Sequence, residues 1–67
     1  MKSVIKVFNM KNTTDISKVR NAISNNEGII ACQINSEKGE VSVVYDNYFV
    51  SLEEIMESIE NLGYTIL

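Results

Sequence analysis

The stretch from Asn9 to Asp15 contains the side chains of this sequence that are best suited to binding. It carries two amides, a thioether, a lysine, two threonines and a carboxylate. It lies between an apolar run typical of a strand and a run with helical periodicity, so it is a loop, where binding groups are often placed. Asn12 and Asp15 offer hard oxygens that suit Mg²⁺ or Ca²⁺, but two ligands fall short of the about six to eight that calcium takes. Both residue types also favour turns and helix starts, and we expect that structural role here.

Two features of the composition restrict the chemistry further. The sequence has no histidine and a single cysteine, Cys32. Without histidine, the usual general base at neutral pH and the commonest metal ligand are missing. One thiol excludes an internal disulfide and any two-thiolate metal site within one chain. Most nucleophilic and metal-assisted catalysis cannot be assembled from what remains, and we expect the protein not to be an enzyme.

The overall composition is that of a small globular domain. Of the 67 residues, 45% are hydrophobic and 22% are charged, which suits one modest core. The formal net charge of −3 disfavours nucleic acid, whose binding relies on clustered lysine and arginine. Apolar runs are too short to span a bilayer, and no secretory leader is recognisable. We expect one complete cytoplasmic domain over residues 1–67, without a membrane or nucleic-acid partner.

The order of the periodic segments predicts the fold. Runs rich in β-branched and aromatic residues predict four strands, at residues 3–8, 29–34, 41–45 and 64–67. A first helix is expected after the Asn9–Asp15 loop, with Thr13 or Thr14 as its N-cap. In a second helix, Ser51 and Glu54 fit a capping box. The β-α-β-β-α-β order predicts a ferredoxin-like α+β domain, a four-stranded antiparallel sheet with both helices on one face.

Alternation and helical spacing also predict which side chains are buried. Ile5 and Val7 fall on one face of the first strand, whereas Val4 and Phe8 fall on the other. The second helix has an apolar stripe that we expect to face the core, made of Leu52, Ile55, Met56, Ile59 and Leu62.

Several short motifs at the strand boundaries resemble one known family. They are Asn9-Met10-Lys11, Gly28-Ile29, Tyr45-Asp46 and Gly63-Tyr64. The heavy-metal-associated (HMA) domain of copper chaperones and metal-transporting P-type ATPases has Gly-Met-Thr-Cys-x-x-Cys, Gly-Val, Tyr-Asp and Gly-Tyr at these places. The chain is similar to this family over nearly its whole length, which implies the same ferredoxin-like fold.

The resemblance fails at the metal-binding loop. Counted from Met10, the two cysteine positions of the family fall on Asn12 and Asp15. The family's thiolates bind a soft cation such as Cu(I), which hard oxygens hold poorly. The resemblance therefore implies a metallochaperone-like scaffold with a degenerate metal site. We expect Met10 to be an apolar plug that anchors the loop, the commoner use of methionine.

Two functions stay open. The first is a docking module related to heavy-metal transport, without a cofactor, that contacts an HMA domain of a metal-transporting ATPase, another domain or a second copy of itself. Lys11, Lys18 and Arg20 surround the first helix, and complementary charges near the loop would select the partner. The contact candidates are Met10, Lys11, Asn12, Thr13, Lys18 and Tyr64.

The alternative is a carrier of Cu(I) or Zn²⁺ with atypical ligands. Met10, Asn12 and Asp15 are weak candidates within one chain, and Cys32 could be shared across a dimer. We expect Cys32 to be a buried small hydrophobe in mid-strand, with an exposed edge-strand thiol as the alternative. Tyr64 resembles a tyrosine beside the metal loop in bacterial relatives, and we expect it to close the core with its hydroxyl at the surface.

Overall fold

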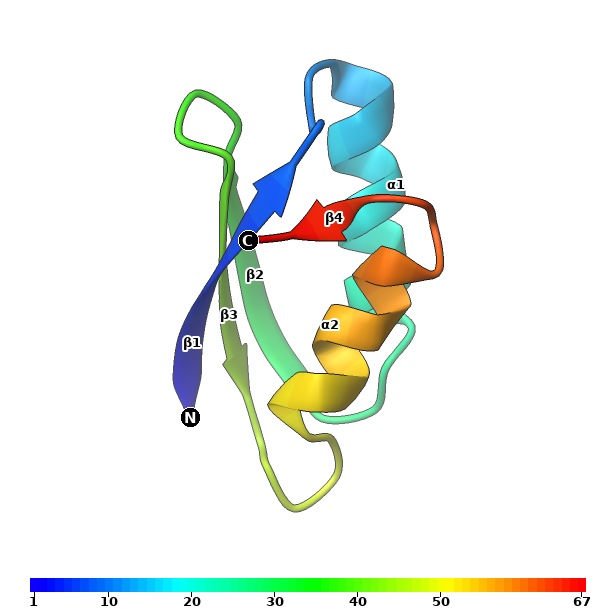
Figure 1. The fold of residues 1–67 in the computed structure, drawn as a ribbon. Helices are drawn as coiled ribbons and strands as arrows, with labels where there is room; N and C mark the ends of the chain where they lie inside the picture. Colours follow the sequence, from blue (N-terminus) through cyan, green and yellow to red (C-terminus); the bar gives the residue numbers. More distant parts are fainter.

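Two helices cover one face of a single sheet in the computed structural model, which describes all 67 residues (Figure 1). The elements in chain order are β1 (Lys2–Phe8), α1 (Thr13–Ser24), β2 (Ile29–Asn35), β3 (Glu40–Tyr45), α2 (Leu52–Glu60) and β4 (Thr65–Ile66). The strand order is β2-β3-β1-β4, and each neighbouring pair is antiparallel. This arrangement confirms the predicted ferredoxin-like α+β fold.

Alternation along β1 sorts its side chains between the core and the open face of the sheet. Ile5 and Val7 are buried beneath the helices, as predicted, whereas Val4 and Phe8 are 58% and 52% exposed on the other face. Ile5 stands opposite Val41 of β3, which is also buried. A slip of one residue would exchange the two faces, so burial of these side chains determines the register of β1.

The core lies between the sheet and the helices. Its 11 buried side chains are all hydrophobic, and no polar side chain is buried among them. Val19 and Ile23 face it from α1, and Ile55 and Ile59 face it from α2, all without exposed area. Positions i and i+4 share one face of a helix, so each pair forms a short apolar stripe.

The second helix begins as predicted and ends earlier than its apolar pattern indicated. Ser51 Oγ accepts a hydrogen bond from the Glu54 N–H at 3.1 Å, and Glu54 Oε1 accepts one from the Ser51 N–H at 3.3 Å, which confirms the capping box. The prediction that Leu62 faces the core was wrong, because α2 ends at Glu60 and Leu62 is 43% exposed. Beyond the helix end, the spacing of 3.6 residues no longer places side chains on one face.

Gly28 allows the turn before β2 to approach the segment before α2. Its φ is +91°, and a Cβ there would lie 2.7 Å from Phe49 Cβ and 3.1 Å from the Asp46 carbonyl oxygen. Its carbonyl accepts a hydrogen bond from the Asp46 N–H at 2.8 Å. A side chain at this position would be both strained and overlapping.

Gly63 provides a matched test of these two costs. Its φ is +98°, but a Cβ there would meet nothing within 4 Å. We expect Gly28→Ala to lower the free energy of unfolding by about 3 kcal/mol, from strain and overlap together, and Gly63→Ala by about 1 kcal/mol, from strain alone. Urea denaturation followed by circular dichroism measures both. Equal losses would contradict the overlap at Gly28.

Candidate functional site

The loop between β1 and α1 begins with a sharp change of chain direction. Asn9 has a φ of +71°, a left-handed conformation that asparagine tolerates better than most residues. Met10 follows, and its side chain is only 5% exposed within the core cluster. This burial agrees with the predicted anchoring role of Met10, and it removes the side chain from the surface that a partner could touch.

The first helix starts with a capping box formed by Asn12 and Asp15. Asn12 Oδ1 accepts a hydrogen bond from the Asp15 N–H at 2.8 Å, and Asp15 Oδ2 accepts one from the Asn12 N–H at 3.3 Å. The prediction of Thr13 or Thr14 as the N-cap was therefore wrong, since both lie in the first turn of the helix. Asparagine is the better N-cap, and here an acidic residue stands three positions later to complete the box.

Asp15 links this loop to a distant part of the chain. Its Oδ2 also accepts a hydrogen bond from the Lys11 N–H at 3.0 Å. Its Oδ1 accepts a hydrogen bond from the Tyr64 hydroxyl, 49 positions further along the chain. Tyr64 lies between α2 and β4. One carboxylate thus joins the β1–α1 loop, the first turn of α1 and the segment that leads into β4.

These hydrogen bonds shift the pKa of both partners. The Tyr64 hydroxyl, followed by the Lys11 N–H, lowers the pKa of Asp15 below its usual value of 3.8. The same bond to Asp15 raises the pKa of Tyr64 to about 12. A lowered carboxyl pKa adds stability above 3.8 that is lost as the pH falls through the folded-state value. A raised phenol pKa adds stability below 10.0 that is lost as the pH rises towards 12. At neutral pH, Asp15 is therefore ionised and Tyr64 is protonated, as their hydrogen bond requires.

The pKa of Tyr64 gives a direct test of this bond. We expect Asp15→Ala to lower the pKa of Tyr64 from about 12 towards 10.0, because the acceptor is removed. The measurement is a pH titration by NMR of protein with ¹³C-labelled tyrosine rings, with Tyr64→Phe to assign the signal. Asp46→Ala is the matched control, because its carboxylate accepts a hydrogen bond from the Tyr48 N–H and not from Tyr64. A Tyr64 pKa that is equal in the wild type and Asp15→Ala would contradict the bond.

The surface around this network is basic, although the chain as a whole is acidic. Lys11, Thr13 and Lys18 are exposed, and the charge of Lys18 is close enough to lower the pKa of Asp15. The neighbouring helix α2 carries exposed Glu53, Glu54, Glu57 and Glu60. The loop and α1 therefore present the cations of Lys11 and Lys18 on an acidic chain, and their contact with a partner stays a prediction.

Cys32 lies away from this loop. It is on β2 opposite Val43, at the edge of the sheet furthest from β4. Its side chain packs against the core but is only half-buried, so the prediction of a buried thiol needs correction. No strand covers β2 on its outer side, which leaves part of the side chain in water. Burial raises the pKa of the thiol, with a smaller opposite effect from Arg20, so the thiolate is disfavoured.

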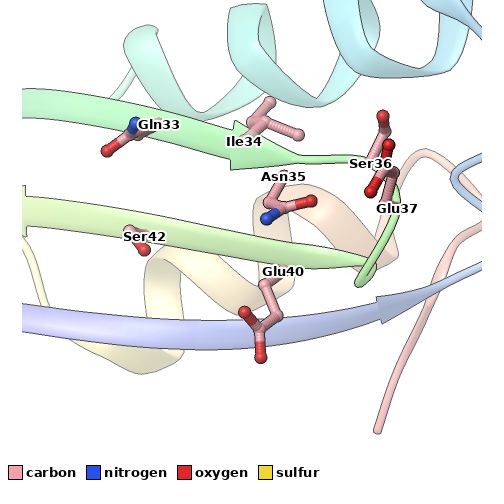
Figure 2. Close-up of a pocket in the computed structure, with 7 residues that line it drawn as sticks. All are labelled: Gln33, Ile34, Asn35, Ser36, Glu37, Glu40 and Ser42. Carbon is pink, nitrogen blue, oxygen red and sulfur yellow. The ribbon is translucent and has the colours of Figure 1, made fainter.

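A polar hollow at the β2–β3 hairpin was not anticipated from the sequence. Figure 2 shows Gln33 and Ser42, which pair across the strands, and Asn35 beside its partner Glu40. Asn35 Oδ1 already accepts a hydrogen bond from the Lys38 N–H at 3.3 Å. Polar residues around a turn are what a hairpin itself requires, which is why the sequence pattern indicated only a hairpin here.

The potential ligands in the β1–α1 loop are already bonded within the protein. Asn12 Oδ1 and both carboxylate oxygens of Asp15 accept hydrogen bonds, and the thioether of Met10 is in the core. Nowhere do three histidine, cysteine, aspartate or glutamate side chains gather as a metal site would need. The loop therefore does not fit a soft cation, which prefers sulfur ligands. Neither helix has the length and hydrophobicity to cross a membrane.

Comparison with known sequences relates the chain to metal-transport proteins. The family model described as the heavy-metal-associated domain matches residues 4–65. The copper chaperone CopZ of Staphylococcus aureus (strain MRSA252) is 35% identical over 51 residues, which cover 76% of this chain and 75% of CopZ.

Solved structures agree with the sequence comparison. A CopZ metallochaperone is similar with a TM-score of 0.96 and 30% identity over 100% of both chains. A copper binding domain from HMA7, a P-type ATPase, is similar with a TM-score of 0.92 and 26% identity, over 98% of this chain and 89% of that domain. The whole chain thus has the fold of these two proteins.

Proposed function

This chain belongs to the heavy-metal-associated domain family, and we propose that it is a docking module of heavy-metal transport that does not itself carry Cu(I). The observation that supports this role most directly is the use of the family's two ligand positions. Asn12 and Asp15 cap α1, and Asp15 also accepts a hydrogen bond from Tyr64, so neither side chain presents free ligand atoms. The fold and the loop that the family presents to its surroundings are kept, while the soft ligands are replaced.

The basic surface beside the loop favours a partner with an acidic surface. Lys11 and Lys18 are exposed, and the nearby carboxylate of Asp15 is occupied by hydrogen bonds. An acidic surface on the partner would meet the positive charges of Lys11 and Lys18, which favours fast and selective encounter. An HMA domain of a metal-transporting ATPase is the first candidate partner. A second copy of this chain, through its acidic α2, is the other candidate.

The same residues support a role without catalysis. A carboxyl group with a lowered pKa, such as Asp15, is a weak general base at neutral pH. A thiol with a raised pKa, such as Cys32, is a weak nucleophile. We therefore propose a binding protein and not an enzyme, acting in the cytoplasm.

A Cu(I) competition titration separates docking from metal carriage. We expect the reduced wild-type protein to bind Cu(I) and Zn²⁺ more weakly than about micromolar, or roughly −8 kcal/mol. The double variant Asn12→Cys/Asp15→Cys is expected to bind Cu(I) at least about 1,000-fold more tightly, because it restores two soft ligands on the family scaffold. The titration is done anaerobically against a competing chelator.

Tight stoichiometric binding by the wild type would overturn the docking-only proposal. Cys32→Ser is the variant that then assigns the ligands. Loss of the binding in Cys32→Ser would indicate a metal bridged between two copies. Retention of the binding in Cys32→Ser would indicate Met10, Asn12 and Asp15.

Charge reversal tests the docking surface itself. We expect Lys11→Glu/Lys18→Glu to weaken binding at least about tenfold, since it replaces attraction to an acidic partner by repulsion. The partners to test are a metal-binding domain of a copper ATPase, with binding followed by NMR titration of ¹⁵N-labelled protein, and a second copy of this chain, with association followed by sedimentation. Lys2→Glu/Lys38→Glu changes the net charge equally on β1 and the β2–β3 turn, and it should change affinity less than about twofold. Equal effects of the two double variants would show that total charge, and not this surface, governs binding.

A further inference from the structure

We infer that the hydrogen bonds of Asp15, including the one from Tyr64, keep the β1–α1 loop ordered without metal, so that the docking surface is the same whether or not copper is present. The inference rests on the proposed function for its biological meaning. The order of the β1–α1 loop, however, is a property of the isolated protein and can be measured on it.

The loop backbone depends on one carboxylate. Lys11 and Asn12 are exposed, yet the N–H groups of both donate to Asp15 Oδ2, at 3.0 and 3.3 Å. Hydrogen bonds to an ionised acceptor are roughly twice as strong as neutral ones. The carboxylate also lies at the N-terminus of α1, where the helix dipole favours negative charge. The bonds therefore define the path of the loop between Met10 and the helix.

The second attachment comes from Tyr64, which is 49 positions further along the chain. The Tyr64 side chain packs against the core, so its ring has a defined position from which the hydroxyl donates to Asp15 Oδ1. Met10 is buried beneath the same loop. The loop is thus anchored below by an apolar contact and at the side by a hydrogen bond, and neither anchor involves a metal.

A pair of cysteines at the same positions would not make these contacts. Sulfur is a weak acceptor and has no second oxygen, so a cysteine at position 15 could not hold two backbone N–H groups and a phenol together. In the reduced protein, the side chains at positions 12 and 15 would then be tied to each other only by a shared cation. Asn12 and Asp15 tie themselves through the capping box. With Asn12 and Asp15 in place of two cysteines, hydrogen bonds within the protein order the loop, and no bound cation is needed.

Amide hydrogen exchange measured by NMR tests this inference. With a chelator present, we expect the N–H groups of Lys11 and Asn12 to exchange at least about tenfold more slowly in the wild type than in Asn12→Cys/Asp15→Cys. Adding Cu(I) should leave the wild-type rates unchanged and should slow the rates in the double variant. The Val19 and Ile23 amides, inside α1, report whether each protein is folded.

Tyr64→Phe tests the attachment without changing the capping box. It removes one hydroxyl, and we expect faster exchange at Lys11 and Asn12 with unchanged rates at Val19 and Ile23. Tyr48→Phe is the matched control, because Tyr48 is 86% exposed and should leave the loop rates unchanged.

The hydrogen-exchange rates either support or overturn the inference. Wild-type exchange of Lys11 and Asn12 at the rate of an unstructured chain would overturn the inference, as would equal protection in the metal-free double variant or no effect of Tyr64→Phe. Slow wild-type exchange that is insensitive to Cu(I), together with faster exchange in both variants, would support it. Because exchange is measured on the isolated chain, failure to find a partner would overturn the proposed function and leave this inference standing.

Discussion

The carboxylate of Asp15 holds together one end of the molecule. Two backbone N–H groups of the β1–α1 loop and the hydroxyl of Tyr64 converge on its two oxygens. The pairing of β1 with β4 brings these segments side by side, and Asp15 adds a direct bond between them. Because the acceptor is charged and sits at a helix N-terminus, the same group caps the helix, bonds to the loop backbone and binds the Tyr64 hydroxyl.

The residues that maintain the fold of the family are different from the residues at its metal-ligand positions. The sheet, the two apolar helix stripes and the buried Met10 are enough to keep the HMA shape, as the similarity to CopZ along the whole chain shows. None of those core contacts requires a metal ligand. A different pair of residues at positions 12 and 15 therefore alters what the start of α1 can bind without altering the fold, an example of function residing in a site placed on a common scaffold.

The residues at positions 12 and 15 also affect the charge near the loop. A cysteine pair would be neutral or would share its charge with a cation, whereas Asp15 brings a permanent negative charge that is satisfied internally. The exposed charges that remain around the loop are those of Lys11 and Lys18. On an acidic chain with a net charge of −3, they form a local basic surface, and local charge governs encounter over distances shorter than the Debye length.

The sequence alone determined the elements, the fold and the absence of a cysteine pair. Period-two alternation placed Ile5 and Val7 inside, and Ser51 with Glu54 located the start of α2, because these patterns depend on neighbours only a few residues apart. The tertiary structure decided which residue caps α1, how far Cys32 is buried on its edge strand and where Leu62 lies relative to the core. It also decided the bond between Asp15 and Tyr64, whose partners are 49 positions apart. No local pattern encodes that bond, because it exists only once the packed helices and sheet bring the two loops together.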